Sequence, residues 1–175
     1  MKRKDLGLEG LWIFAVTFLT VVLEVAACRL QLLFPGALFA CFYVVVSHGR
    51  IVGLIAGALA VTVVEVVLAR ELTLLPVIPF VMIGAYYWAR EGERHAVVVQ
   101  VIPCAILAVI HSTAYRIGDP MSAGILNPPD LGSIGGTILG QSTIAAILLP
   151  LLVLVCDWAA QQLDLPRFRR AKRPA

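Results

Sequence analysis

Three ionisable residues lie inside long apolar runs of the sequence: Glu24, Glu65 and His111. Ionisable side chains are costly in hydrocarbon, and those found there usually serve a function or pair with another polar group. The two carboxylates could line a buried polar site or an ion or proton path, and His111 could carry protons or bind a metal. We favour a structural role, in which the carboxylates lie near the interface or pair with Arg29, Arg70 or a neighbouring helix. His111 would then make a hydrogen bond between helices.

The motifs of common catalytic sites are missing from the sequence, which contains no HExxH, no GxSxG and no GxxxxGK[ST]. Ser142 follows Gly140 but lacks the second glycine of a nucleophile elbow. His111 has no second histidine or cysteine three or four residues further on, as a metal pair on one helix would need. The cysteines lack the CxxC spacing of zinc or redox motifs: Cys28, Cys41, Cys104 and Cys156. We therefore expect no enzymatic activity, no cofactor and no metal site.

Glycines recur at intervals of four residues in two apolar runs. Gly53 and Gly57 form one GxxxG pair, and Gly132, Gly136 and Gly140 repeat the spacing later in the chain. Small residues four apart lie on one face of a helix and let another helix approach closely, which is how membrane helices gain packing energy. The spacing predicts helix-packing faces at these five glycines, and it identifies no partner.

The composition of the 175-residue chain does not suit a soluble domain. Hydrophobic residues make up 60% of the chain and charged residues 14%, and the mean hydropathy is +0.92. Globular domains have roughly 45–50% apolar and about 25% charged residues. A soluble fold of this size could not hide so much apolar surface from water. We expect a single α-helical domain embedded in a lipid bilayer.

Six apolar runs are separated by charged or polar residues. Runs of about 18 or more residues with few charges indicate membrane spans, and a helix satisfies its own backbone within lipid. The second and fourth runs are slightly short for a full crossing. The spans are expected over residues 11–27, 32–47, 51–69, 74–89, 96–115 and 133–156, followed by a cytoplasmic basic tail at 157–175.

The basic residues of the chain are distributed unevenly between the ends of the expected spans. With six spans and a cytoplasmic start, eleven of the 14 Lys and Arg residues lie on the inner side and three on the outer side. This asymmetry agrees with the positive-inside rule and places both termini in the cytoplasm. Because the basic residues lie at membrane ends rather than on one face, we expect no nucleic-acid partner.

The stretch from Phe34 to Tyr87 combines several features in order. A proline opens the second run, a polar and basic turn follows, a glycine-rich third run carries an acidic residue, and aromatic residues end the fourth run. These features are Pro35, His48-Gly49-Arg50, Gly53 and Gly57 with Glu65, and Tyr86-Tyr87-Trp88. The closing segment, from Leu149-Pro150 through Asp157 to the basic tail, adds to the pattern. Together with the small size and six spans, they resemble the rod shape-determining protein MreD family.

The resemblance implies both a fold and a role. The fold would be a six-transmembrane-helix bundle similar to the membrane substrate-binding subunits of energy-coupling-factor transporters. The role would be that of a non-enzymatic scaffold in the bacterial inner membrane. It would join an MreC-like single-span protein and MreB filaments to the wall-synthesis enzymes of the cell-elongation complex, which acts in cell shape and peptidoglycan synthesis. The alternative is a substrate-binding subunit of an energy-coupling-factor vitamin transporter, for which Glu24, Glu65 and Tyr115 would be pocket residues.

Overall fold

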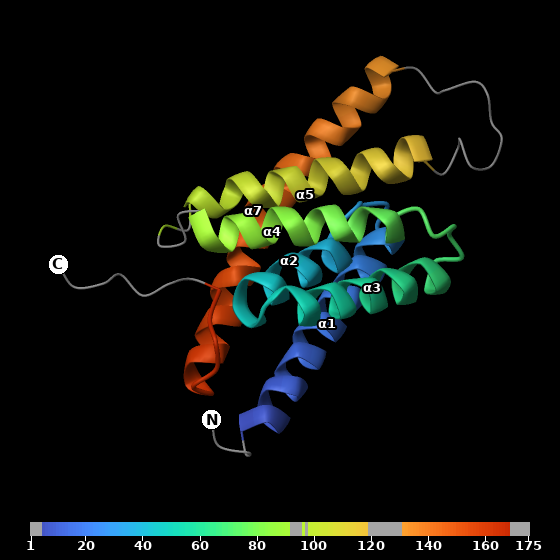
Figure 1. Ribbon diagram of the computed structural model, residues 1–175. Coiled ribbons are helices and arrows are strands. Elements are labelled where there is room, and N and C mark those ends of the chain that lie inside the picture. Colours follow the sequence, from blue (N-terminus) through green and yellow to red (C-terminus); the bar gives the residue numbers. More distant parts are fainter. Residues whose placement is uncertain (1–4, 92–95, 97, 119–130, 169–175) are drawn as a thin grey trace.

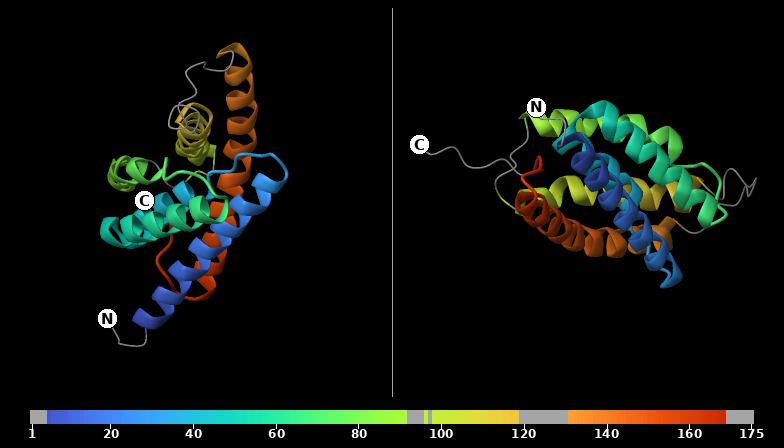
Figure 2. Two further views of the ribbon diagram at one scale, coloured as in Figure 1. Left: turned by 90° about the vertical axis from the view of Figure 1, so that its right-hand side faces the viewer. Right: turned by 90° about the horizontal axis from the view of Figure 1, so that it is seen from below.

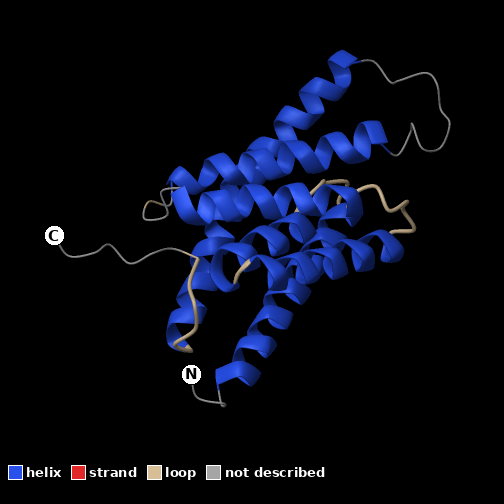
Figure 3. Ribbon diagram, in the orientation of Figure 1, coloured by secondary structure: helices blue, strands red, loops and turns tan. Residues whose placement is uncertain are grey.

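The computed structural model describes residues 5–91, 96, 98–118 and 131–168, and this part of the chain is α-helical without strands (Figure 3). Continuous apolar runs form helices in lipid because a helix leaves no backbone polar group unpaired along its length. The main helices are α1 (Asp5–Arg29), α2 (Gly36–His48), α3 (Arg50–Val67), α4 (Ile78–Glu91), α5 (Val101–Thr113) and α7 (Leu131–Gln162). Short turns precede α4 (η1, Leu75–Val77) and α5 (η2, Val98–Gln100), and a π-helical turn, η3 (Ala114–Gly118), extends α5.

Helix α2 forms the centre of the bundle. All its residues from Gly36 to Val46 are buried, and it packs against α1, α3, α4 and α5. A helix that is apolar on every side needs apolar surroundings, and the neighbouring helices provide them here. At about 1.5 Å per residue, its 13 residues span only ~20 Å, so α2 is shorter than the ~30 Å hydrocarbon core of a bilayer.

The helices alternate in direction along the chain (Figure 1). The start of α1 and the ends of α2, α4 and α7 lie toward one end of the bundle, while the α1–α2 and α3–α4 connections lie toward the other. α3 packs beside α4 and α5 packs against α7, and α1 and α7 lie obliquely to the other helices, as the turned views of Figure 2 also show. With 32 residues and a length of about 48 Å, α7 exceeds the ~30 Å hydrocarbon core, and its apolar, span-like segment is the 25-residue stretch Ile138–Gln162.

A single residue, Gly49, connects α2 to α3. Its φ of 103° lies in a region that side-chain-bearing residues avoid, which is why a glycine makes this tight reversal possible. Its backbone N–H donates to the carbonyl of Val45, and its own carbonyl accepts the N–H of Gly53, so the backbone of the turn remains paired. The reversal lays the first turns of α3 directly against α2.

Four helical segments within the described residues are long and apolar enough to cross a membrane: Gly7–Arg29, Arg50–Val67, Val98–Arg116 and Ile138–Gln162. Their outward faces carry large apolar side chains, such as Phe14 on α1, Ile55 on α3 and Ile147 on α7, that would be unfavourable in water. The chain is therefore an α-helical, multi-pass membrane protein. α2 is an apolar helix below the length of a typical span.

The helix bounds differ from the expected spans mainly at proline and at the chain ends. α2 begins at Gly36 because Pro35 occupies the position just before the helix, rather than its first turn. α4 begins at Ile78, after the η1 turn that contains Pro76. α7 runs on past Cys156 to Gln162, since nothing after Pro150 interrupts its backbone pairing. The long loop expected at 116–132 lies mostly outside the described residues.

Candidate functional site

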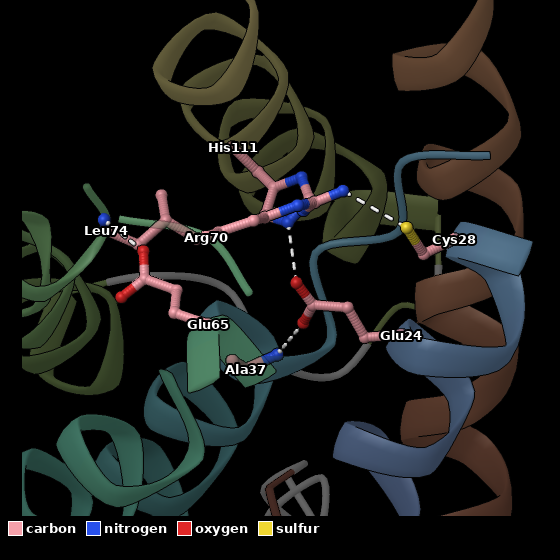
Figure 4. A network of polar contacts seen from close by, with 7 residues as sticks. All are labelled: Glu24, Cys28, Ala37, Glu65, Arg70, Leu74 and His111. Atoms are coloured by element: carbon pink, nitrogen blue, oxygen red, sulfur yellow. Dashed lines mark hydrogen bonds and ion pairs between the residues drawn. The ribbon is translucent and has the colours of Figure 1, made fainter. Parts of the chain in front are cut away.

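The expected intramembrane residues Glu24 and His111 meet inside the bundle, although 87 residues separate them in sequence. Glu24 lies late in α1 and His111 late in α5, and 2.8 Å separates Glu24 Oε1 from His111 Nε2 (Figure 4). Both side chains are buried, with only 2% and 1% of their surfaces exposed. Within apolar surroundings a carboxylate–imidazole pair is strong, because neither group has water as an alternative partner. The pair ties α1 to α5.

The second oxygen of Glu24 is also occupied. Oε2 accepts a hydrogen bond from the backbone N–H of Ala37 at 2.7 Å. Ala37 stands in the first turn of α2, where backbone N–H groups have no partner within the helix and the helix dipole favours a negative charge. Glu24 therefore caps α2 from a neighbouring helix. Gly36 makes this approach possible, since a Cβ at that position would collide with the backbone carbonyl of Thr20.

Tyr115 and Arg70 continue the site from His111 toward the end of the bundle that carries the α3–α4 connection. The Tyr115 ring meets the His111 ring edge-on, with centroids 4.8 Å apart. The guanidinium of Arg70 lies over the Tyr115 ring, 4.2 Å from its centroid, and its Nη2 donates to Cys28 Sγ at 3.1 Å. Arg70 is half-buried, whereas Tyr115, His111 and Glu24 are buried, so the groups form a column from the surface to the interior. We call Arg70, Tyr115, His111 and Glu24 the polar column.

Glu65, the other expected intramembrane carboxylate, lies at the end of α3 and is fully buried. Its Oε1 accepts the backbone N–H of Leu74 at 2.7 Å. Leu74 stands at the start of the η1 turn, so this bond closes the connection between α3 and α4. A carboxylate in this position satisfies a backbone donor of an irregular segment that lipid cannot satisfy. Like Glu24, Glu65 holds a loop against the helix bundle.

Asp157 forms a second buried polar cluster at the opposite end of the bundle, and sequence reasoning did not single it out. Its Oδ1 accepts the backbone N–H of Phe168 at 2.8 Å and lies 3.4 Å from the hydroxyl of Tyr43. The Phe168 ring is fully buried and stacks on Tyr43, with centroids 5.7 Å apart, and also contacts Phe42. The segment after α7 therefore folds back onto α2. The one feature of the sequence that could have indicated this cluster is the position of Asp157 at the end of an apolar run.

The five glycines expected to form packing faces differ in their surroundings. A Cβ at Gly53 would lie 2.6 Å from the backbone nitrogen of Val45, and one at Gly57 would collide with Cys41, so both lie where α3 contacts α2. A Cβ at Gly136 or Gly140 would meet no atom within 4 Å. The surroundings of Gly132 lie outside the described part of the structure. Close helix contact is thus seen at the first pair and not at Gly136 or Gly140.

Apolar hollows open on the outer surface of the described helices. A groove of about 460 Å³ between α1 and α3 is lined mainly by apolar side chains, among them Ile13, Phe14, Phe18, Ile55, Leu59 and Val63. A smaller hollow of about 250 Å³ lies among α2, α4 and α5. Neither contains any residue of the polar column.

In the described part of the chain, no three His, Cys, Asp or Glu side chains gather as a possible metal-ion site. What the polar column can do is hold helices together, exchange a proton between Glu24 and His111, and hydrogen-bond a guest at the free side of the imidazole. Comparisons of the chain with protein-family models, curated proteins and solved structures return no match.

Proposed function

We propose that this protein is a non-enzymatic scaffold of the bacterial cell-elongation complex, as its resemblance to the MreD family implies. One observation carries the proposal: the buried carboxylates Glu24 and Glu65 each hold a connecting segment in place. Glu24 uses one oxygen for His111 and the other for the start of α2. Carboxylates employed in this way serve the architecture of the bundle, which is what a scaffold requires of its membrane domain.

The groove between α1 and α3 supports the same role. It is apolar and faces outward. The small residues Gly10, Ala56 and Ala60 in its lining leave room for another backbone to approach closely. A single membrane-spanning helix is the occupant that suits such a surface. An MreC-like single-span protein is therefore the partner we propose, with the wall-synthesis enzymes joining the same assembly.

The proposal includes a six-span arrangement in the inner membrane with both termini in the cytoplasm. The six main helices overlap the six expected runs, and their directions alternate. The excess of Lys and Arg at one set of helix ends supports this orientation. In this arrangement α2 and α4 cross with the help of the short segments that precede them.

A second candidate is the substrate-binding membrane subunit of an energy-coupling-factor vitamin transporter. The observation that favours it is the group of buried polar side chains around His111 and Tyr115, near the end of the bundle that we assign to the outer side. A substrate pocket needs a few convergent polar groups of this kind. The purified protein would then retain a vitamin through size-exclusion chromatography, whereas a scaffold would not.

Copurification with MreC from the same cells tests the scaffold. Leu59→Trp fills the α1–α3 groove from a side chain that is 61% exposed, and we expect it to lose MreC while the wild type retains it. Ile147→Trp is the matched control, because Ile147 is equally exposed at 60% but lies on α7, away from the groove. Recovery of the wild-type protein without MreC would overturn the proposal. Equal recovery of MreC with both variants would overturn the α1–α3 groove as the partner surface.

A further inference from the structure

The imidazole of His111 has one nitrogen that its hydrogen bond with Glu24 leaves unused. Nε2 faces Glu24, whereas Nδ1 is buried and has no hydrogen-bond partner among the described residues. A buried polar atom in an apolar environment costs free energy unless something pairs with it.

Three more buried polar side chains on α5 and α7 share this property. Ser112 follows His111 directly on α5, and Gln141 and Ser142 lie on α7, the helix that packs against α5. The hydroxyls of Ser112 and Ser142 and the carbonyl oxygen of Gln141 are buried without a hydrogen-bond partner in the described structure. Two packed helices thus bring four unsatisfied polar side chains to their buried surfaces.

The serine hydroxyls differ from several other helical hydroxyls of this bundle, and Thr17 Oγ1 on α1 is the one further helical Ser or Thr hydroxyl of the described residues that is buried without a partner. Hydroxyls in helices usually pair with a carbonyl one turn earlier, and Ser47, Thr62 and Thr143 do so here, at 2.7 Å, 2.8 Å and 2.8 Å. Thr143 is the direct neighbour of Ser142 on α7. The same turn of helix offers Ser142 an equivalent carbonyl, yet the Ser142 hydroxyl has no hydrogen-bond partner among the described residues.

We propose that α5 and α7 enclose a hydrated binding site for small uncharged hydrogen-bonding molecules, closed at its outer end by Arg70 and Tyr115. The uncharged class follows from the buried position, since a charged guest would be costly in this apolar interior. Glu24 is already bonded to His111 and to the backbone N–H of Ala37, so it offers a guest no free carboxylate. What remains for a guest is a set of neutral hydroxyl, amide and imidazole atoms. The site is separate from the α1–α3 groove, so it stands whether or not the scaffold role does.

Thiol labelling of the full-length protein in lipid nanodiscs tests the site. Ser112→Cys and Ser142→Cys are small changes that place a thiol at two of its walls. Methanethiosulfonates react with the thiolate, which forms only where water reaches the sulfur, so reaction reports hydration. The reagents are the neutral methyl compound and its trimethylammonium-ethyl analogue. Mass spectrometry identifies the modified cysteine. Native Cys104 on α5 and Leu149→Cys on α7, both fully buried among apolar residues, are the controls.

We expect the introduced thiols to react with the neutral reagent at least about tenfold faster than the two controls, and much more slowly with the cationic reagent. Arg70→Gln should raise the neutral rate by opening the outer end. Rates as slow as those of Cys104 would overturn the site. Equal rates with both reagents would overturn the uncharged class, and an unchanged rate in Arg70→Gln would overturn the closure by Arg70. Copurification with MreC is unaffected by any of these outcomes.

Discussion

At the scale of single residues, the chain uses its few buried ionisable groups in combinations. Glu24 and His111 are each costly alone in an apolar interior, and each makes the other acceptable. Their types and their positions in apolar runs could be predicted from the sequence, as could a hydrogen bond between helices. The partner could not, because 87 residues separate the two and their contact depends on how α1 and α5 cross. The pairing of Glu24 with the start of α2 depends equally on the path of the chain at Gly36.

The coupling between Glu24 and His111 is open to measurement. We expect Glu24→Gln and His111→Gln each to lower the free energy of unfolding in detergent, because either change strands a buried polar partner. The double variant should lose less than the sum of the two, with an interaction energy of about 1–3 kcal/mol. Arg90 and Glu91, an exposed ion pair with N–O distance 3.1 Å, provide a control cycle in which we expect no measurable coupling. Strictly additive losses at Glu24 and His111 would show that the pair contributes nothing jointly.

At the scale of helices, glycine spacing predicts where close packing is possible, and the neighbouring helix decides where it occurs. Gly53 and Gly57 lie against α2 because the turn at Gly49 folds α3 directly back onto it. Gly136 and Gly140 have the same spacing but face no neighbour within 4 Å. Sequence gave no reason to distinguish the two sets, since the periodicity is identical and the difference lies in tertiary structure. The stacking of Phe168 on Tyr43 could not be predicted from the sequence either, because one aromatic residue in a basic tail carries no periodic signal.

Leucine substitutions separate the two glycine sets. Gly53→Leu places a side chain where even a Cβ would lie 2.6 Å from the backbone of α2. We expect a loss of about 1–3 kcal/mol or more in unfolding free energy, with a fall in the yield of monodisperse protein. Gly140→Leu, at an exposed position with open space around it, should leave both quantities nearly unchanged. If Gly53→Leu matched Gly140→Leu in stability and yield, α3 would not pack on α2 through this face.

At the scale of the whole molecule, composition alone identifies a helical membrane protein, and hydropathy places its apolar segments to within a few residues. Hydropathy does not predict how those segments are arranged. α2 has the apolar character of a span but is the buried centre of the bundle, and its 13 residues fall short of a bilayer's thickness. Hydropathy cannot distinguish a helix surrounded by protein from one surrounded by lipid, since both demand apolar side chains. The number of crossings therefore depends on the two short helices, α2 and α4.

Labelling of introduced cysteines in intact cells decides whether the short helices cross. Gln31 and Arg50 flank α2, Glu71 and Glu91 flank α4, and all four are exposed. In a Cys28→Ser background, we expect a membrane-impermeant maleimide to modify Gln31→Cys and Glu71→Cys directly. Arg50→Cys and Glu91→Cys should react only after permeabilisation, because a crossing helix separates the members of each pair. Two flanking positions that react from the same side would mean that the helix between them does not cross, which would reduce the six-span arrangement toward the four spans that length alone supports.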